Sequence, residues 1–156
     1  MKGQSLFEVV VAIGIAALII VGVVSLATTS IRNSSFSRNK TLASRFSQEA
    51  IEWLRVEKDA DWDIFKTNVE SCDLAGSCCV EAIPSWETGS CDVAEVIPGT
   101  IFIREASFTC LDSDGTTQVL CPAAEIIETS LTTSWIDGQG THDAKASTQF
   151  TNWRAQ

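Results

Sequence analysis

Six cysteines are the residues of this chain with the most distinctive chemistry, because a cysteine can join a disulfide, bind zinc or act as a nucleophile. All six lie beyond residue 71. Their spacing lacks the Cys-x-x-Cys pairs that are typical of structural zinc sites. An even number of cysteines in a small domain behind an apolar N-terminal segment instead predicts disulfides formed in an oxidising compartment. The predicted disulfide cysteines are Cys72, Cys78, Cys79, Cys91, Cys110 and Cys121.

The sequence predicts one of these disulfides directly. Cys110 and Cys121 flank a turn motif at residues 112–115, Asp-Ser-Asp-Gly, which would bring them together as the ends of a hairpin. Cys78 and Cys79 are adjacent and would pair with each other only under strain, so each should reach a different partner. We expect the four cysteines from Cys72 to Cys91 to pair among themselves, with their connectivity left open.

Other candidate sites are weaker. His142 is the only histidine and no Ser/His/Asp or Cys/His arrangement can be argued around it, so we expect a surface histidine, no enzyme activity and no cofactor. Asp112 and Asp114 resemble the start of a calcium-binding loop, but the further oxygen ligands and the distal acid are missing, which favours a plain turn. Trp62 and Trp86 could be exposed binding aromatics, although packing inside the protein is the usual role.

An uncharged apolar run extends from Val9 to Leu26. At about 1.5 Å per residue it nearly spans a hydrocarbon core of roughly 30 Å. The run could belong to a secretory signal peptide cleaved near residues 25–27, Ser-Leu-Ala, or to an uncleaved anchor. Neither interpretation explains Glu8, because a carboxylate at the head of an apolar helix costs roughly 2.5 kcal/mol or more to insert. We therefore expect Glu8 to be functional.

Charge is divided unevenly along the chain. Residues 1–58 carry seven Lys/Arg and four Asp/Glu, whereas residues 59–156 carry four and sixteen, a net charge of −12. A surface this acidic repels phosphate backbones, so no direct nucleic-acid binding is expected. The basic residues that follow the apolar run would place the body of the protein inside the cell, whereas the cysteines indicate export. We give the cysteines more weight, because the charge rule is only a bias. The basic residues are Arg32, Arg38, Lys40 and Arg45.

The segment around Glu8 resembles the leader of type IV pilins and pseudopilins, in that a short basic leader ending in Gly3 precedes Gln4-Ser5-Leu6-Phe7-Glu8 and the apolar run. The resemblance implies that a prepilin peptidase cuts between Gly3 and Gln4, that the new amine of Gln4 is methylated, and that Glu8 becomes the fifth mature residue. In a filament core the Glu8 carboxylate would then neutralise the terminal ammonium of a neighbouring subunit, since a lone buried charge is costly. Major pilins usually have Phe at the position of Gln4, which favours a minor subunit.

A long helix must carry these N-terminal residues. Apolar residues at spacings of four and three continue the helical pattern to about Lys58, which predicts a membrane or filament-core helix at 4–27 and an amphipathic helix at 28–58. The Ser-, Thr- and Asn-rich stretch between Thr28 and Thr41 suggests a flexible or bent passage. The apolar stripe of the second half comprises Leu42, Phe46, Ala50, Trp53 and Leu54.

The distal part divides into a predicted loop and a predicted sheet. Residues 59–98 are rich in Gly, Ser, Cys and acids and predict a cysteine-rich loop region held by disulfides. Residues 99–156 predict an antiparallel sheet with strands at 101–108, 125–135 and 144–150 and a turn at 137–140. Packing of this sheet on the apolar stripe gives an α+β fold, pilin-like, with a long N-terminal helix against an antiparallel sheet.

The C-terminal strands carry a looser second resemblance. A Trp-ended strand, a Gly-rich turn and a closing Ser-Thr-x-Phe-Thr-Asn-Trp strand are similar to minor pilins of the pilus-modification group and to type II secretion pseudopilins. The resemblances imply a structural subunit, a minor pilin, of a type IV pilus or related filament, with a leader peptide at 1–3. Its partners would be other pilin subunits, prepilin peptidase, the assembly platform and the membrane, and its head would be exported to a cell-surface filament. The alternatives are a pseudopilin, or a membrane-anchored binding protein or adhesin that does not polymerise.

Overall fold

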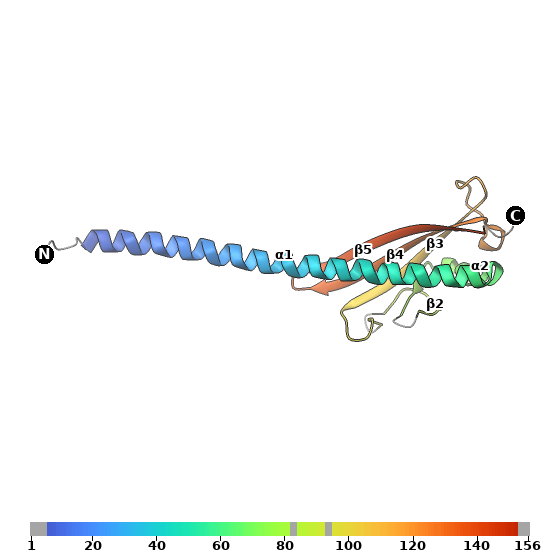
Figure 1. Cartoon of the computed structure of the whole chain (residues 1–156), viewed down its shortest axis with the longest axis horizontal. Coiled ribbons are helices and arrows are strands. Elements are labelled where there is room, and N and C mark those ends of the chain that lie inside the picture. The colour runs from blue at the N-terminus through green and yellow to red at the C-terminus, as the bar shows by residue number, and fades with distance from the viewer. Residues whose placement is uncertain (1–5, 82–83, 93–94, 153–156) are drawn as a thin grey trace. The chain divides into compact units, whose positions relative to one another are not determined.

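The computed structural model describes residues 6–81, 84–92 and 95–152 of the chain. It consists of two compact units, residues 1–39 and residues 40–156. Helix α1 (Leu6–Ala60) runs through the boundary between the units (Figure 1). The predicted long N-terminal helix is therefore confirmed, and each unit is described separately below.

Helix α1 continues without interruption through the Ser- and Thr-rich stretch for which the sequence predicted a flexible or bent passage. Threonine hydroxyl groups at the start of this stretch donate to carbonyls one turn back, within the helix itself. Thr28 Oγ1 lies 2.9 Å from the carbonyl oxygen of Val24, and Thr29 Oγ1 lies 3.0 Å from that of Ser25. These bonds satisfy the polar side chains on the helix itself.

In the second unit, α1 packs against the sheet along one buried line. Ala43, Ser47, Ala50 and Leu54 are buried and recur at spacings of four and three, as the helical period requires. The predicted stripe lies on and beside this line, with Leu42, Phe46 and Trp53 half-buried at its margins. The side of the helix away from this line, which includes Arg45, Glu49 and Glu52, is exposed.

The predicted loop at 59–98 is wrong over a third of its length, because residues 62–74 form a second helix, α2 (Trp62–Leu74). Asp61 caps its N-terminus, with Asp61 Oδ1 accepting from the amide nitrogens of Asp63 and Ile64 at 2.9 and 3.0 Å. Phe65, Val69 and Cys72 then bury one face at spacings of four and three. The capping residue and the apolar spacing were both present in the sequence, but the Gly, Ser, Cys and acidic composition of residues 59–98 favoured a loop.

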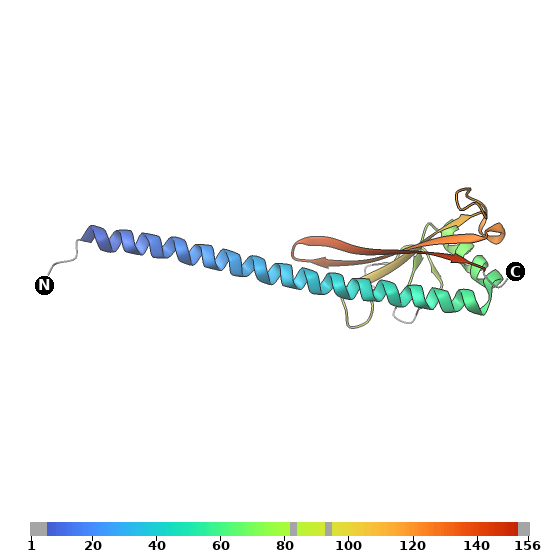
Figure 2. The ribbon, with the colours of Figure 1, turned by 45° about the horizontal axis from the view of Figure 1, so that its top comes forward.

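The sheet has five antiparallel strands in the order β2-β1-β3-β4-β5. Two short strands, β1 (Cys78–Cys79) and β2 (Glu87–Thr88), form one margin. Three long strands, β3 (Phe102–Leu111), β4 (Ile126–Asp137) and β5 (Gly140–Thr151), form the rest (Figure 2). The predicted antiparallel sheet and its turn at 137–140 are confirmed, and the α+β fold with them.

The core lies between the two helices and one face of the sheet. An aromatic cluster packs against this core, where the half-buried Trp86 approaches Trp53, Phe65 and Phe108 with ring centroids 5.2 to 5.9 Å apart. The Trp86 indole nitrogen donates to Glu57 Oε2 at 3.2 Å. Trp62 is half-buried and stacks on Phe65. Both tryptophans therefore take the packing role, and neither is a freely exposed binding aromatic.

Candidate functional site

The exposed apolar surface of α1 is the main candidate site of the first unit. The helix contains an 18-residue window with a mean hydropathy of 3.0, and none of that window is buried in the chain. Leu18 is 76% exposed and Leu26 is 74% exposed. Among the described residues this helix is long and apolar enough to cross a membrane. Such a surface requires either lipid or other apolar helices around it.

Glu8 stands in the first turn of this helix, where its side chain is exposed. A carboxylate in the first turn is favoured by the partial positive charge of the helix N-terminus. It forms no ion pair with any described residue. The predicted cleavage and methylation residues, Gly3 and Gln4, lie outside the described residues.

Three disulfides stabilise the second unit, residues 40–156, which is called the head from here on. All six cysteines are paired. Cys110 joins Cys121, the pair that the turn motif predicted. The four remaining cysteines pair among themselves as Cys72–Cys78 and Cys79–Cys91, so the adjacent Cys78 and Cys79 do reach different partners. The first of these bridges ties α2 to β1, and the second ties β1 to the segment that follows β2. These two bridges therefore anchor short elements that bury few residues themselves.

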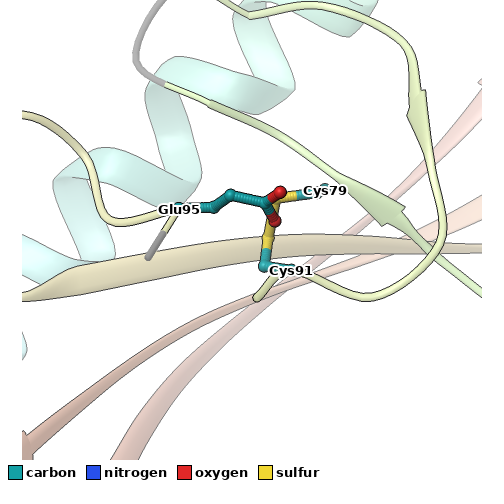
Figure 3. Close-up of side chains that lie close together, drawn as sticks. All are labelled: Cys79, Cys91 and Glu95. Carbon is teal, nitrogen blue, oxygen red and sulfur yellow. A yellow bond between two sulfur atoms is a disulfide. The ribbon is translucent and has the colours of Figure 1, made fainter. Parts of the chain in front are cut away.

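One bridge lies beside a carboxylate, as Figure 3 shows. Cys79, Cys91 and Glu95 bring three potential ligand atoms within 4.8 Å of one another, the one such group among the described residues. The two sulfurs are bonded to each other, however, and a disulfide lacks the thiolate charge that binds metals. Glu95 Oε2 instead accepts from the amide nitrogen of Asp92 at 2.6 Å. With the Cys79–Cys91 disulfide formed, this group closes a loop and does not form a metal site.

The two aspartates of the weak calcium candidate are used by the turn itself. Asp114 Oδ1 accepts from the amides of Thr116 and Thr117 at 2.8 and 2.9 Å, and its Oδ2 accepts from the Thr117 hydroxyl at 2.7 Å. The backbone amide of Thr117, followed by that of Thr116, lowers the pKa of the Asp114 carboxyl far below its usual range. Asp112 Oδ1 accepts from the amide of Ser113 at 2.7 Å. This is the plain turn that the sequence favoured.

His142 differs from the expected surface position. It lies in β5 with its side chain 22% exposed, and its Nε2 is 3.0 Å from Asp137 Oδ1. Its ring packs on Trp135 with centroids 5.4 Å apart. The amide of Gln139 is the main cause of a lowered pKa at Asp137, and His142 adds to it. The histidine thus ties the β4–β5 turn to the end of the sheet.

A buried arginine that sequence analysis missed joins three parts of the head. Arg104 of β3 is 1% exposed. Its guanidinium donates to the carbonyl oxygens of Phe46 in α1, at 2.8 Å, and of Val80, at 3.1 Å, and also to that of Glu81. Burial lowers its pKa, while the charge of Glu49 raises it. Alternation along the strand could have signalled this residue, because it falls at an inward-facing position.

No family model, curated protein or solved structure matches this chain.

Proposed function

We propose that this chain is a structural subunit of a type IV pilus or a related pilin-like filament, most similar to a minor pilin, and that it is not an enzyme. A prepilin peptidase would remove residues 1–3, and the helix from Gln4 onward would first sit in the membrane and then pass into the filament core. The disulfide-bonded head would be exported and would face the outside of the filament.

The observation that carries this proposal is the exposed apolar N-terminal part of α1, which has an acid in its first turn. A signal peptide or a simple anchor needs the apolar run but has no use for Glu8, whose insertion is costly. In a bundle of such helices, Glu8 of one subunit can neutralise the amine of Gln4 of the next. The pair then fixes the register of neighbouring helices, because any other register leaves two unpaired charges in an apolar core.

The structure of the head is a second argument for the same proposal. Its helix is the continuation of the apolar helix within the single element α1. A buried arginine ties this helix to the sheet, one disulfide ties α2 to β1, and the other two tie neighbouring segments to β1 and β3. A small domain that must stay folded outside the cell gains from such links, each disulfide typically contributing about 2–4 kcal/mol.

The test is incorporation into filaments. The chain is expressed in cells that have a prepilin peptidase and a pilus assembly platform, and surface filaments are sheared off and probed for it. We expect the chain in the sheared fraction when the peptidase is active and only in the membrane when the peptidase is inactivated. A processed chain that never leaves the membrane fraction would instead favour the non-polymerising binding protein.

A further inference from the structure

The two margins of the sheet are treated differently. At the β3 side, backbone groups of β3 are met by short segments along most of the strand: Val80 donates to Arg104, Val119 donates to Cys110 and Ile97 donates to Phe102. At the other side, β5 is the last strand of the sheet and is 12 residues long. It contains no proline, and its pairing with β4 has no interruption. A long regular edge of this kind is a template for a further strand.

The pairing register identifies which backbone groups of β5 are open. Asp137 pairs with Gly140 across a two-residue turn, which makes them a hydrogen-bonded pair. Even-numbered residues of β5 therefore direct their amides and carbonyls toward β4, and odd-numbered residues direct theirs outward. No described segment meets the outward groups. The odd-numbered residues of the strand are Thr141, Asp143, Lys145, Ser147, Gln149 and Thr151.

Charge on this edge is self-complementary. Asp143 and Lys145 are exposed, project from the same outer face of the sheet, and form no ion pair among the described residues. If a second β5 lies antiparallel with Ala144 opposite Ala144, each Asp143 faces a Lys145 of the other copy. The same register sets Thr141 opposite Ser147. It also places the outward amides and carbonyls of one copy opposite those of the other. Other antiparallel registers that keep odd-numbered residues opposite odd-numbered residues either leave Asp143 and Lys145 without an opposite charge or set like charges opposite each other.

We propose that β5 is an interaction surface for a second copy of this chain, which adds its own β5 antiparallel in the register centred on Ala144. The addition joins two five-stranded sheets into one, with main-chain hydrogen bonds supplying affinity and the two Asp143–Lys145 pairs fixing the register. Antiparallel addition reverses the strand direction, whereas the subunits of one filament all run the same way. The contact therefore joins heads of two filaments, or two subunits outside a filament.

The test uses charge exchange on the full-length chain in detergent, with self-association measured by sedimentation. Wild type is expected to form dimers. Asp143→Lys and Lys145→Asp each set like charges opposite and should each weaken association about fivefold or more. The double exchange restores two opposite pairs and should return association to near the wild-type level. The Glu8→Ala background keeps this contact separate from any association through α1, and the same pattern is expected there.

Two further measurements identify the edge itself. Ser147→Pro removes an outward amide without touching the β4 ladder and should abolish dimers, whereas the matched Ser147→Ala should not. In the dimer, amide exchange at Asp143, Lys145 and Ser147 should slow at least tenfold, while His142 and Ala144 are protected in the monomer already. A wild-type chain that stays monomeric in the Glu8→Ala background, or a double exchange that fails to restore dimers, would overturn the proposal.

Discussion

Ser47 of α1 and Thr133 of β4 are joined by a hydrogen bond of 2.7 Å between their hydroxyl oxygens, and both residues are fully buried. Ser47 Oγ also lies 3.1 Å from the carbonyl oxygen of Ala43. A serine has one hydroxyl proton, so Ser47 donates it to Ala43 and accepts from Thr133. This pair links the long helix to β4, as the Arg104 bond to the Phe46 carbonyl links it to β3, and the two together restrict the rotation of the helix over the strands.

Removal of one partner of this link should destabilise the head. Ser47→Ala leaves the Thr133 hydroxyl buried without an acceptor and should lower the free energy of unfolding by about 1–3 kcal/mol. Adding Thr133→Val removes the orphaned hydroxyl, so the double variant should recover part of the loss. Urea unfolding of the four proteins in the double-mutant cycle measures the coupling, and strictly additive losses would contradict the hydrogen bond.

Arg104 should be the most sensitive single residue of the head. Arg104→Met keeps the bulk of the side chain but removes the three guanidinium hydrogen bonds to the carbonyls of Phe46, Val80 and Glu81, and hydrogen bonds of a charged group contribute about 1.5–3 kcal/mol each. Arg104→Lys retains the charge but cannot reproduce the planar fork, and should recover only part of the stability. Thermal unfolding compares the two. Arg45→Met, at an exposed position on α1, is the matched control and should change little.

The order of the main elements could be predicted from sequence, because in each of them the spacing of the apolar residues matched the period of a helix or a strand. The alternation along residues 126–137 and the heptad-like spacing after Leu42 each bury one face, and each became the expected element. Helix α2 was missed because its capping residue, Asp61, stands in an acidic run that broke the preceding period. Arg104 was missed because a charged residue at an inward position is rare, and only tertiary structure supplies its three acceptors.

The sequence predicted one of the three disulfides in full and only restricted the pairing of the other two. A turn between Cys110 and Cys121 fixes that pair locally, and Cys78 and Cys79 excluded each other by geometry. The choice of Cys72 as the partner of Cys78 needed α2, whose last turns bring Cys72 to the start of β1. The role of Glu8 is outside what one chain can display, because its expected partner belongs to another subunit.

Loss of the Cys110–Cys121 bridge should cost about 2–4 kcal/mol, since it closes a loop with a sequence separation of 11 residues. The paired change of both cysteines to serine avoids a free thiol. Reduction of all three bridges should loosen residues 59–98 before the three long strands, and leave α1 of the first unit unchanged. Amide exchange with and without reductant measures this order, and simultaneous loss of protection everywhere would contradict it.

Glu8 should be needed for assembly and not for insertion. Glu8→Ala removes the only carboxylate of the first 48 residues and should leave membrane insertion and processing intact. Incorporation into sheared filaments should fall at least tenfold, because the partner ammonium would be buried without a countercharge. Glu8→Gln keeps the shape and removes the charge, so it should fail in the same way. Assembly of either variant at the wild-type level would refute the proposed role of this carboxylate.

The mature N-terminus is the most direct test of the proposed filament subunit. Mass spectrometry of the protein recovered from cells with a prepilin peptidase should find a chain that begins at Gln4 and carries one methyl group on its amine. Cells without the peptidase should contain the chain with Gly3 still attached. A mature chain that begins at Thr28, or an intact Met1 in the presence of the active peptidase, would contradict the account.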